Sequence, residues 1–264
     1  MEAYNDEPLS PLKGIRVLDL TVMLTGPYLT RILAQFGADV IKIEKPGEGD
    51  PLRTPSTGSM VELLNGGKRS VSVNLKTPEG VALIKKMAAE ADVFVENFRD
   101  GVMDRLGLSY GVLSQLNPSL LYCSLRGLSG SHAGLATHDL NFVAASGVGE
   151  WFLECGPHYS TFFADIVGGT FVPAMRILAQ LADPNRPGMH LVAHMDEGFR
   201  SLYLPRAFET ALKRIRLHFL RAKCRARDFT LAPKALGFRC KPFRSKTGKR
   251  SARPCKNLSG FPGG

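Results

Sequence analysis

The sequence predicts an α/β protein built on a Rossmann-like, doubly wound parallel sheet. Short apolar segments of strand length alternate with helical segments through most of the first two hundred residues, a pattern typical of parallel strands with helices on both faces. The first two strands are joined by a short apolar helix, the usual crossover between parallel neighbours. A length of 264 residues and an apolar content of 44% allow one or two domains with ample core.

The first predicted strand–helix–strand unit is short and apolar. Residues 14–20 (GIRVLDL) form a predicted buried strand, and residues 26–36 form a helix with Pro27 near its first position. Gly37 ends this helix, and residues 38–44 (ADVIKIE) form the second strand. We therefore expect these two strands to lie parallel in one sheet.

The remaining elements follow the same alternation. The helix over residues 77–89 has the clearest start, because Thr77 is a favoured capping residue and Pro78 suits the first helical position. The other predicted elements are a loop at 45–50, an irregular region at 51–63, a basic glycine-rich loop at 65–70, strands at 71–75, 92–96, 120–124 and 188–194, and helices at 102–106, 110–116 and 166–181.

The stretches THDLNFVAASG and TFFADIVGG carry the candidate chemistry. The first holds His138 and Asp139; the second places Asp165 at the predicted start of a helix, where backbone N–H groups and the helix dipole favour a carboxylate. An imidazole and a carboxylate on either side of a substrate carbon would make a two-base proton-transfer site. Gly168 and Gly169 would let a substrate approach the backbone. A simpler alternative is that these polar residues only cap helices.

The net charge of +10 belongs to the end of the chain. Residues 213–264 hold 16 of the 34 Lys and Arg but only one of the 24 Asp and Glu, so the first 212 residues are mildly acidic. This distribution argues against nucleic-acid binding by the body of the protein.

Cysteine and histidine spacing gives no metal pattern. The five cysteines contain no CxxC, which favours a reduced, intracellular protein. His190 and His194 would pair at a metal only on a helix, and their surroundings predict a strand. The N-terminus resembles neither a signal nor a transit peptide, and no apolar run is long enough to span a membrane.

Several long motifs, in order, resemble one family. They are GIRVLDLT, FGADVIKIEKPGEGDPLR, NGGKRSVSVNLKTPEG, ADVFVENFRDGVMDRLGL, NPSLLYCSLRG, HDLNFVAASG and ADIVGG. Together they resemble the family III CoA-transferases over residues 12–204, and the HDLN motif with His138 resembles the α-methylacyl-CoA racemase branch. The resemblance implies the large α/β domain of that family.

The resemblance also implies where coenzyme A lies, along loops that follow the strands. The matching positions are Met23, Leu24, Lys45, Gly67, Lys68, Arg69, Asn97, Phe98, Arg99 and Arg105. Lys and Arg suit such places because they pair with phosphate oxygens. We expect Lys68 and Arg69 to contact phosphate, and Lys42 to be solvated surface.

By the same resemblance, the substrate is an acyl-CoA thioester whose α-proton is exchanged. His138 would serve one face of the α-carbon and Asp165 the other, with Asp139 supporting the site and backbone N–H groups stabilising the enolate oxygen. No cofactor is needed beyond the CoA of the substrate.

Two alternatives stay open. In a CoA-transferase, Asp165 would be a nucleophile that attacks the thioester and forms a mixed anhydride, and His138 would not be needed. A non-catalytic product is the other alternative, because the resemblance stops near the end of the chain.

The predicted organisation is a flexible N-terminus at 1–11, the large domain at 12–204, and a divergent basic tail at 205–264, disordered at least from residue 238. Family members carry a second, smaller domain and interlock as homodimers, an arrangement that this divergent tail does not support. Relatives of this kind work in peroxisomes or mitochondria, and the cytoplasm is the alternative.

Overall fold

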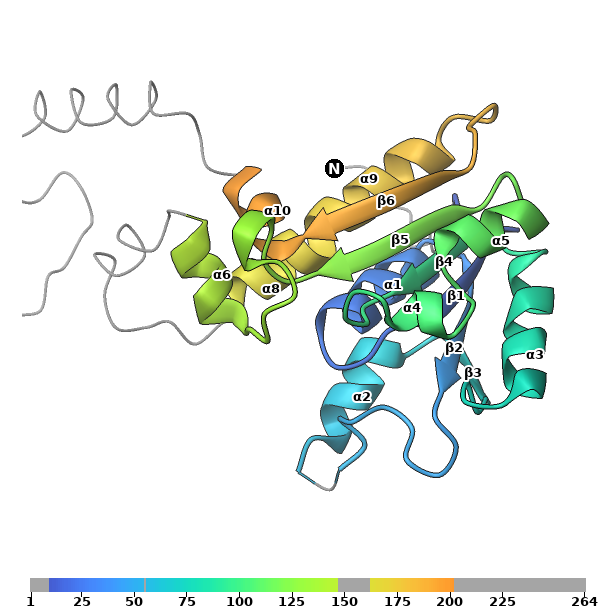
Figure 1. Ribbon diagram of the computed structural model, residues 1–264, viewed down its shortest axis with the longest axis horizontal. Helices are drawn as coiled ribbons and strands as arrows, with labels where there is room; N and C mark the ends of the chain where they lie inside the picture. Colours follow the sequence, from blue (N-terminus) through green and yellow to red (C-terminus); the bar gives the residue numbers. More distant parts are fainter. Residues whose placement is uncertain (1–9, 55, 147–161, 202–264) are drawn as a thin grey trace, which may run out of the picture. The chain divides into compact units, whose positions relative to one another are not determined.

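The computed structural model describes residues 10–54, 56–146 and 162–201, all within one compact unit (Figure 1). Its centre is a six-stranded sheet in the order β3-β2-β1-β4-β5-β6, with every pair of neighbours parallel. The strands are β1 Arg16–Leu20, β2 Asp39–Glu44, β3 Arg69–Ser72, β4 Val93–Glu96, β5 Leu121–Arg126 and β6 Met189–His194. The predicted α/β fold with a doubly wound parallel sheet is confirmed.

Helices cover both faces of the sheet. The helices are α1 Thr25–Gln35, α2 Gly58–Asn65, α3 Pro78–Ala88, α4 Val102–Arg105, α5 Tyr110–Leu116, α6 Asp139–Ala145, α8 Phe163–Ile166, α9 Val172–Leu181 and α10 Met195–Ser201. A 3-10 turn at Gly130–His132 and a π-helical turn at Val167–Phe171 complete the described elements. In that part of the chain, no helix has the length and apolarity to cross a membrane.

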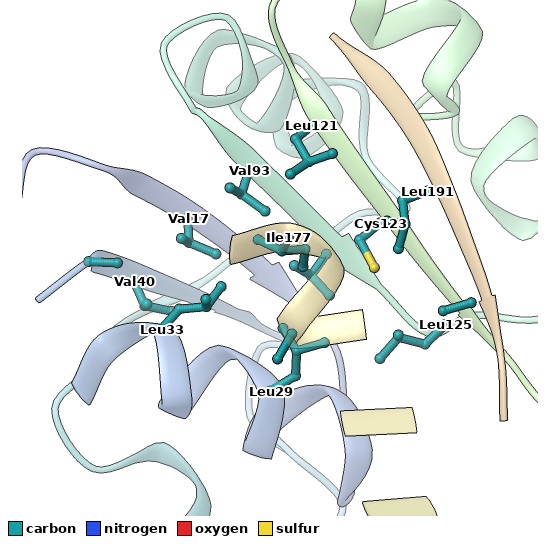
Figure 2. Close-up of a cluster of buried hydrophobic side chains, with 14 of the residues drawn as sticks. Val17, Leu29, Leu33, Val40, Val93, Leu121, Cys123, Leu125, Ile177 and Leu191 are labelled. Carbon is teal, nitrogen blue, oxygen red and sulfur yellow. The ribbon is translucent and has the colours of Figure 1, made fainter. Parts of the chain in front are cut away.

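Successive strand residues feed two separate cores, because side chains alternate across a sheet. Val17 of β1 packs on one face with Leu33 of α1 and Ile177 of α9, as Figure 2 shows. The next residue, Leu18, packs on the other face with Ile84 of α3. Both cores are apolar, and their burial accounts for most of the stabilisation of the sheet.

One predicted irregular region is a helix in the structure. Residues 58–65 form α2, although the region was expected to be irregular because of its Pro, Ser, Thr and Gly content. Val61 and Leu64 are buried in a small core with Leu52, and Tyr28 of α1 packs against it. Packing against a neighbouring helix therefore overrides a weak local preference.

The predicted helix at 166–181 begins three residues early and has three parts. Helix α8 starts at Phe163, the π turn follows, and α9 continues to Leu181. The strand predicted at 71–75 is β3, Arg69–Ser72, which begins two residues and ends three residues earlier than predicted. The start of α3 agrees: Thr77 accepts a hydrogen bond from the Gly80 N–H as the predicted cap. The strand predicted around His190 and His194 is confirmed as β6, which pairs with β5.

The order of the strands reverses between β1 and β4. Crossovers run outward on both sides of this point, so the loops that leave the carboxyl ends of β1 and β4 diverge. These loops begin at Thr21 and Asn97. Ligands of open parallel sheets bind at such a switch point, and several of the predicted CoA contacts lie there.

Some predictions fall outside the described residues. These are the flexible N-terminus, apart from its last residues, the boundary at residue 204 and the disordered tail at 205–264.

Candidate functional site

Asp139 and Asp165 meet at the junction of two helices. Asp139 is the first residue of α6, only 4% exposed, and its Oδ1 accepts the backbone N–H of Asp165 at 2.8 Å. The N–H groups of Phe163 and Ala164 also hydrogen-bond this carboxylate. Asp139 therefore satisfies the start of α8 rather than the start of its own helix.

Asp165 is not a helix cap. It is the third residue of α8, half-buried, with its own N–H bound to Asp139. Burial, reinforced by the neighbouring Asp139 carboxylate, raises the pKa of Asp165 to about 7. At neutral pH this carboxyl group is therefore close to half-protonated, which suits a group that both takes and gives protons.

His138 stands at the N-cap position of α6, directly before Asp139. Its side chain is exposed, and its backbone N–H donates to Asn141 Oδ1 at 3.0 Å. Since α6 packs against α8, the three predicted site residues lie on two contacting helices. The backbone of His138 therefore takes part in capping α6, as the simpler alternative expected. Its imidazole is exposed and accessible to a ligand.

Gly168 and Gly169 serve helix packing rather than substrate approach. Both are buried in the π turn. A Cβ added to Gly168 would lie 2.0 Å from the carbonyl oxygen of Met195, and one added to Gly198 would lie 2.7 Å from that of Gly168. The prediction that these glycines open the backbone to a substrate is therefore wrong. Gly168 lets the π turn approach α10 at backbone distance, and Gly169 lies against the side chains of Thr25 and Met195.

A small apolar core holds the site helices together. It joins Phe142 of α6, Ala164 of α8 and Phe199 of α10. Arg200 of α10 adds a hydrogen bond from Nη2 to the carbonyl oxygen of Ala145, at the end of α6, at 2.9 Å. Sequence reasoning missed Arg200, because a single basic residue on a helix gives no signal of what it contacts.

Several residues predicted to hold CoA lie at the switch point, where they contact the protein itself. The Asn97 carboxamide bonds the backbone of Val22 in both directions, with distances of 3.1 and 2.9 Å. Met23 has a positive φ of 69° and is 46% exposed, and its N–H donates to Asp50 Oδ1 at 3.3 Å. Leu24 packs against the Leu52 core. The loops after β1, β2 and β4 are therefore tied together.

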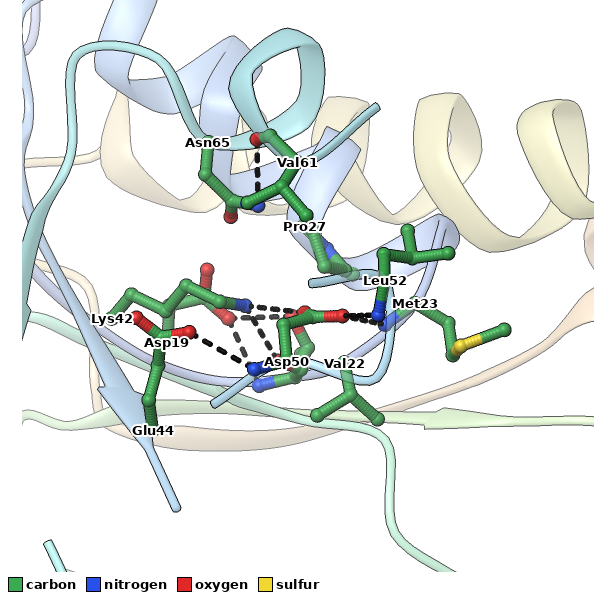
Figure 3. Close-up of polar contacts among 12 residues, drawn as sticks. Asp19, Val22, Met23, Pro27, Lys42, Glu44, Asp50, Leu52, Val61 and Asn65 are labelled. Atoms are coloured by element: carbon green, nitrogen blue, oxygen red, sulfur yellow. Dashed lines mark hydrogen bonds and ion pairs between the residues drawn. The ribbon is translucent and has the colours of Figure 1, made fainter. Parts of the chain in front are cut away.

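Buried charges hold this edge of the sheet. Lys42 Nζ lies 3.0 Å from Asp50 Oδ2 and donates to the Thr21 carbonyl, with both charged side chains nearly inaccessible. Figure 3 shows Asp50 between Lys42 and the backbone of Met23 and Leu52. The prediction that Lys42 is solvated surface is wrong, because it neutralises a buried carboxylate.

Lys68 is buried and has no donor left for a phosphate. Its Nζ contacts Asp19 Oδ2 at 2.9 Å, the Pro27 carbonyl at 2.8 Å and Asn65 Oδ1 at 2.8 Å, which accounts for three N–H donors. Burial would raise the pKa of Asp19, but the charges of Lys68 and Lys42 outweigh it and lower that pKa. The predicted phosphate contact of Lys68 is therefore corrected to a structural ion pair.

Arg69 is also engaged within the protein. Its Nε donates to Asp39 Oδ1 at 2.8 Å, and Asp39 begins β2 at the amino edge of the sheet. The guanidinium thus points to the edge opposite the switch point, and the predicted phosphate contact of Arg69 is not supported. Gly67, with φ 82°, turns the chain into this segment.

Three of the predicted CoA positions are exposed cations that follow β2 or β4. Lys45 follows β2 and pairs with Glu48 at 2.6 Å, whereas Arg99 and Arg105 are exposed beyond β4. Phe98 packs against the core that contains Leu18 and Ile84. Of the predicted CoA positions, these cations are the ones with charge available for phosphate groups.

Sequence reasoning missed a buried ion pair that holds the loop after β4. Glu96 is fully buried, with Oε1 2.8 Å from Arg126 Nη2 and Oε2 accepting the Phe98 N–H at 2.8 Å. Arg126 Nε also donates to Asp100 at 2.6 Å. The acidic residue that ends the apolar VFVE strand is the one signal that could have revealed it.

Within the described ranges, no three His, Cys, Asp or Glu residues gather as a metal site. His190 Nε2 lies 2.9 Å from Ser124 Oγ, and its ring stacks on Tyr110. His194 lies 3.5 Å from Glu197. The two histidines of β6 thus have different partners, which lie on other elements.

Comparison with known proteins gives relatives of two activities. The chain is 37% identical to the human alpha-methylacyl-CoA racemase over 71% of this chain and 48% of that protein. It is 40% identical to the human succinyl-CoA:glutarate CoA-transferase over 53% of this chain and 34% of that protein. The chain thus spans less than half the length of these curated relatives.

A solved structure and a family pattern agree with this similarity. The crystal structure of a CAIB/BAIF family protein from Brucella suis superposes with a TM-score of 0.67 at 30% identity, covering 77% of this chain and 58% of that one. The pattern of CoA-transferase family III matches residues 12–207. The chain belongs to CoA-transferase family III.

Proposed function

We propose that this protein acts on acyl-CoA thioesters and epimerises the α-carbon of a 2-methylacyl-CoA by two-base proton transfer. The observation that carries this proposal is the packing of α6 on α8, which brings the helix that His138 precedes against the helix that carries Asp165. Burial and the neighbouring Asp139 raise the pKa of Asp165 to about 7. A group with that pKa accepts a proton in one direction of an epimerisation and donates it in the other.

The reaction needs one proton removed and one returned. Asp165 or His138 takes the α-proton as a base, and the electron pair of the C–H bond moves into an enolate of the thioester. The other residue, in its protonated form, delivers a proton to the opposite face of the carbon, so that no net proton is lost and the oxidation state is unchanged. The exposed imidazole of His138 is accessible for this role.

We place the CoA moiety at the switch point between β1 and β4. Met23, Leu24, Gly67 and Phe98 would supply backbone and apolar contacts there. Lys45, Arg99 and Arg105 would pair with its phosphates, because their side chains are exposed beyond β2 and β4. Asn97 would act through the Val22 backbone.

CoA transfer is the second candidate. The similarity to a succinyl-CoA:glutarate CoA-transferase at 40% identity favours it. Asp165 would then attack the thioester carbonyl, release CoA and carry the acyl group as a mixed anhydride. This chemistry needs the ionised carboxylate, which a pKa of about 7 provides only in part at neutral pH.

Deuterium incorporation at the α-carbon of a 2-methylacyl-CoA in heavy water tests the proposal. We expect exchange in the parent protein and a loss of at least about a hundredfold in both Asp165→Ala and His138→Ala. His132→Ala is the matched control, because this exposed loop histidine has no proposed role. Transfer of CoA to an added acid that needs Asp165 but not His138 would replace the racemase by the transferase.

A further inference from the structure

The carboxylate of Asp139 spans two helices. Its Oδ1 accepts the Asp165 N–H at 2.8 Å, and the N–H groups of Phe163 and Ala164 bind the same carboxylate. Its Oδ2 is buried without a hydrogen-bond partner among the described residues. The negative charge of Asp139 is thus held in the first turn of the helix that carries Asp165.

We propose that Asp139 is a positioning residue that acts through Asp165: its carboxylate fixes the first turn of α8 and holds a buried negative charge beside the Asp165 carboxyl group. The catalytic consequence rests on the proposed function. The electrostatic effect itself does not, because it follows from the packing of α6 on α8.

The hydrogen bonds decide which of the two carboxyl groups keeps the proton. Burial raises the pKa of Asp139, but three backbone N–H groups oppose that effect by stabilising its ionised form. Burial raises the pKa of Asp165 as well, and there the Asp139 charge adds to the effect. Two neighbouring carboxylates that cannot both ionise easily will share one proton, and Asp165 is the better site for it.

The charged groups on the elements around α8 are largely engaged elsewhere. Asp196 accepts hydrogen bonds from Ser129, and Arg200 donates to carbonyl groups at the end of α6. The remaining charged or titratable groups on α6, α9 and α10 are His138, Arg176 and Glu197. Of all these, Asp139 is the one that bonds the backbone of Asp165.

The variant Asp139→Asn removes the negative charge of residue 139 but keeps an oxygen that can cap α8. The amide oxygen still accepts the α8 N–H groups, while the NH2 group replaces the unpaired oxygen and the charge disappears. We expect the titration midpoint of Asp165 to fall by about one pH unit or more, a roughly tenfold change in its ionisation constant. Carbon-13 NMR of the aspartate carboxyl groups measures this, with Asp165→Asn to assign the signal.

The pH profile of α-proton exchange provides the second readout. Its limb that reports Asp165 should move to lower pH in Asp139→Asn by the same amount as the titration. Asp139→Ala should in addition lower the melting temperature, because the cap of α8 is lost. Asp196→Asn removes another buried carboxylate near the site, and we expect it to leave the titration of Asp165 in place.

The outcomes separate the two hypotheses. An unchanged Asp165 titration in Asp139→Asn would overturn the inference and leave Asp139 as a cap only, even if exchange is normal. A lowered titration midpoint would support the inference. If that shift occurs in a protein whose parent shows no exchange, the racemase proposal fails while the role of Asp139 stands.

Discussion

Two adjacent basic residues, Lys68 and Arg69, lie in opposite environments, and burial determines how much each ion pair contributes to stability. Lys68 is buried against Asp19, whereas the adjacent Arg69 forms an exposed pair with Asp39. A buried charge that loses its partner is far more costly than an exposed one, because water cannot replace the lost contacts.

Lys68→Ala should therefore destabilise the protein by about 3–5 kcal/mol, because it leaves Asp19 buried and unpaired. Arg69→Ala should cost at most about 1 kcal/mol, since its pair with Asp39 is exposed. Urea unfolding at neutral pH measures both changes. Equal losses in the two variants would show that Lys68 does not neutralise Asp19.

Asp165→Asn should raise stability above pH 7. The folded-state pKa of about 7 lies above the ordinary value of 3.8, so the contribution of Asp165 is fully present below about pH 4 and is lost as pH rises to 7. Asn cannot ionise and avoids that loss. Allowing for partial exposure, we expect a gain on the order of 2 kcal/mol at pH 8, measured by urea unfolding at pH 4 and pH 8. The same gain at both values would contradict the raised pKa.

At the scale of elements, the site depends on helices that approach at backbone distance. The π turn at Val167–Phe171 separates α8 from α9 and carries both glycines against α10 and α1. Thr170 Oγ1 adds a hydrogen bond to the Thr25 carbonyl at 2.9 Å. Single π turns are frequent at functional sites, and here the turn begins two residues after Asp165.

Gly168→Ala should destabilise the protein by about 2–4 kcal/mol and reduce exchange, because its Cβ would overlap the Met195 carbonyl. Gly111→Ala is the matched control. Its Cβ would meet nothing within 4 Å, and alanine favours helix α5 by up to about 1 kcal/mol. Thermal unfolding compares the two. A Gly168→Ala protein as stable as the parent would refute the close approach of these helices.

At the scale of the whole domain, the parallel strands give the sheet two different ends. The carboxyl ends of the strands form what is called the carboxyl edge here, and their amino ends form the amino edge. The carboxyl edge gathers the loops after β1, β2 and β4, and buried ion pairs of Asp50 and Glu96 hold these loops. The amino edge carries surface pairs such as Arg16 with Glu90. If CoA binds at the switch point, replacing an arginine near the carboxyl ends of the strands should weaken CoA binding. Replacing an arginine at the amino ends should not.

Arg99→Ala and Arg105→Ala should each weaken CoA binding by about tenfold, because each removes a cation proposed to pair with phosphate. Arg16→Ala should leave binding unchanged, since it lies at the start of β1. Isothermal titration calorimetry with CoA measures these affinities. Weakened binding in Arg16→Ala alone would move the ligand to the opposite edge.

The sequence by itself determined the fold class, most strands and the cap of α3, and it proposed the candidate site residues. These features depend on local periodicity, turn residues and long motifs, all of which can be read along the chain. The helix α2 was missed because its stability comes from contacts with Leu52 and α1.

Only the tertiary structure decided which polar residues are already engaged by partners within the protein. Lys42, Lys68 and Asn97 are engaged by internal partners. Lys68 and Asn97 stand in loops that suit a ligand, and Lys42 lies near the end of β2. The contact of Asp139 with Asp165 joins residues 26 positions apart. Burial and pairing depend on groups brought together by folding, so a linear pattern can propose a charged residue for a site but cannot show whether its charge remains available.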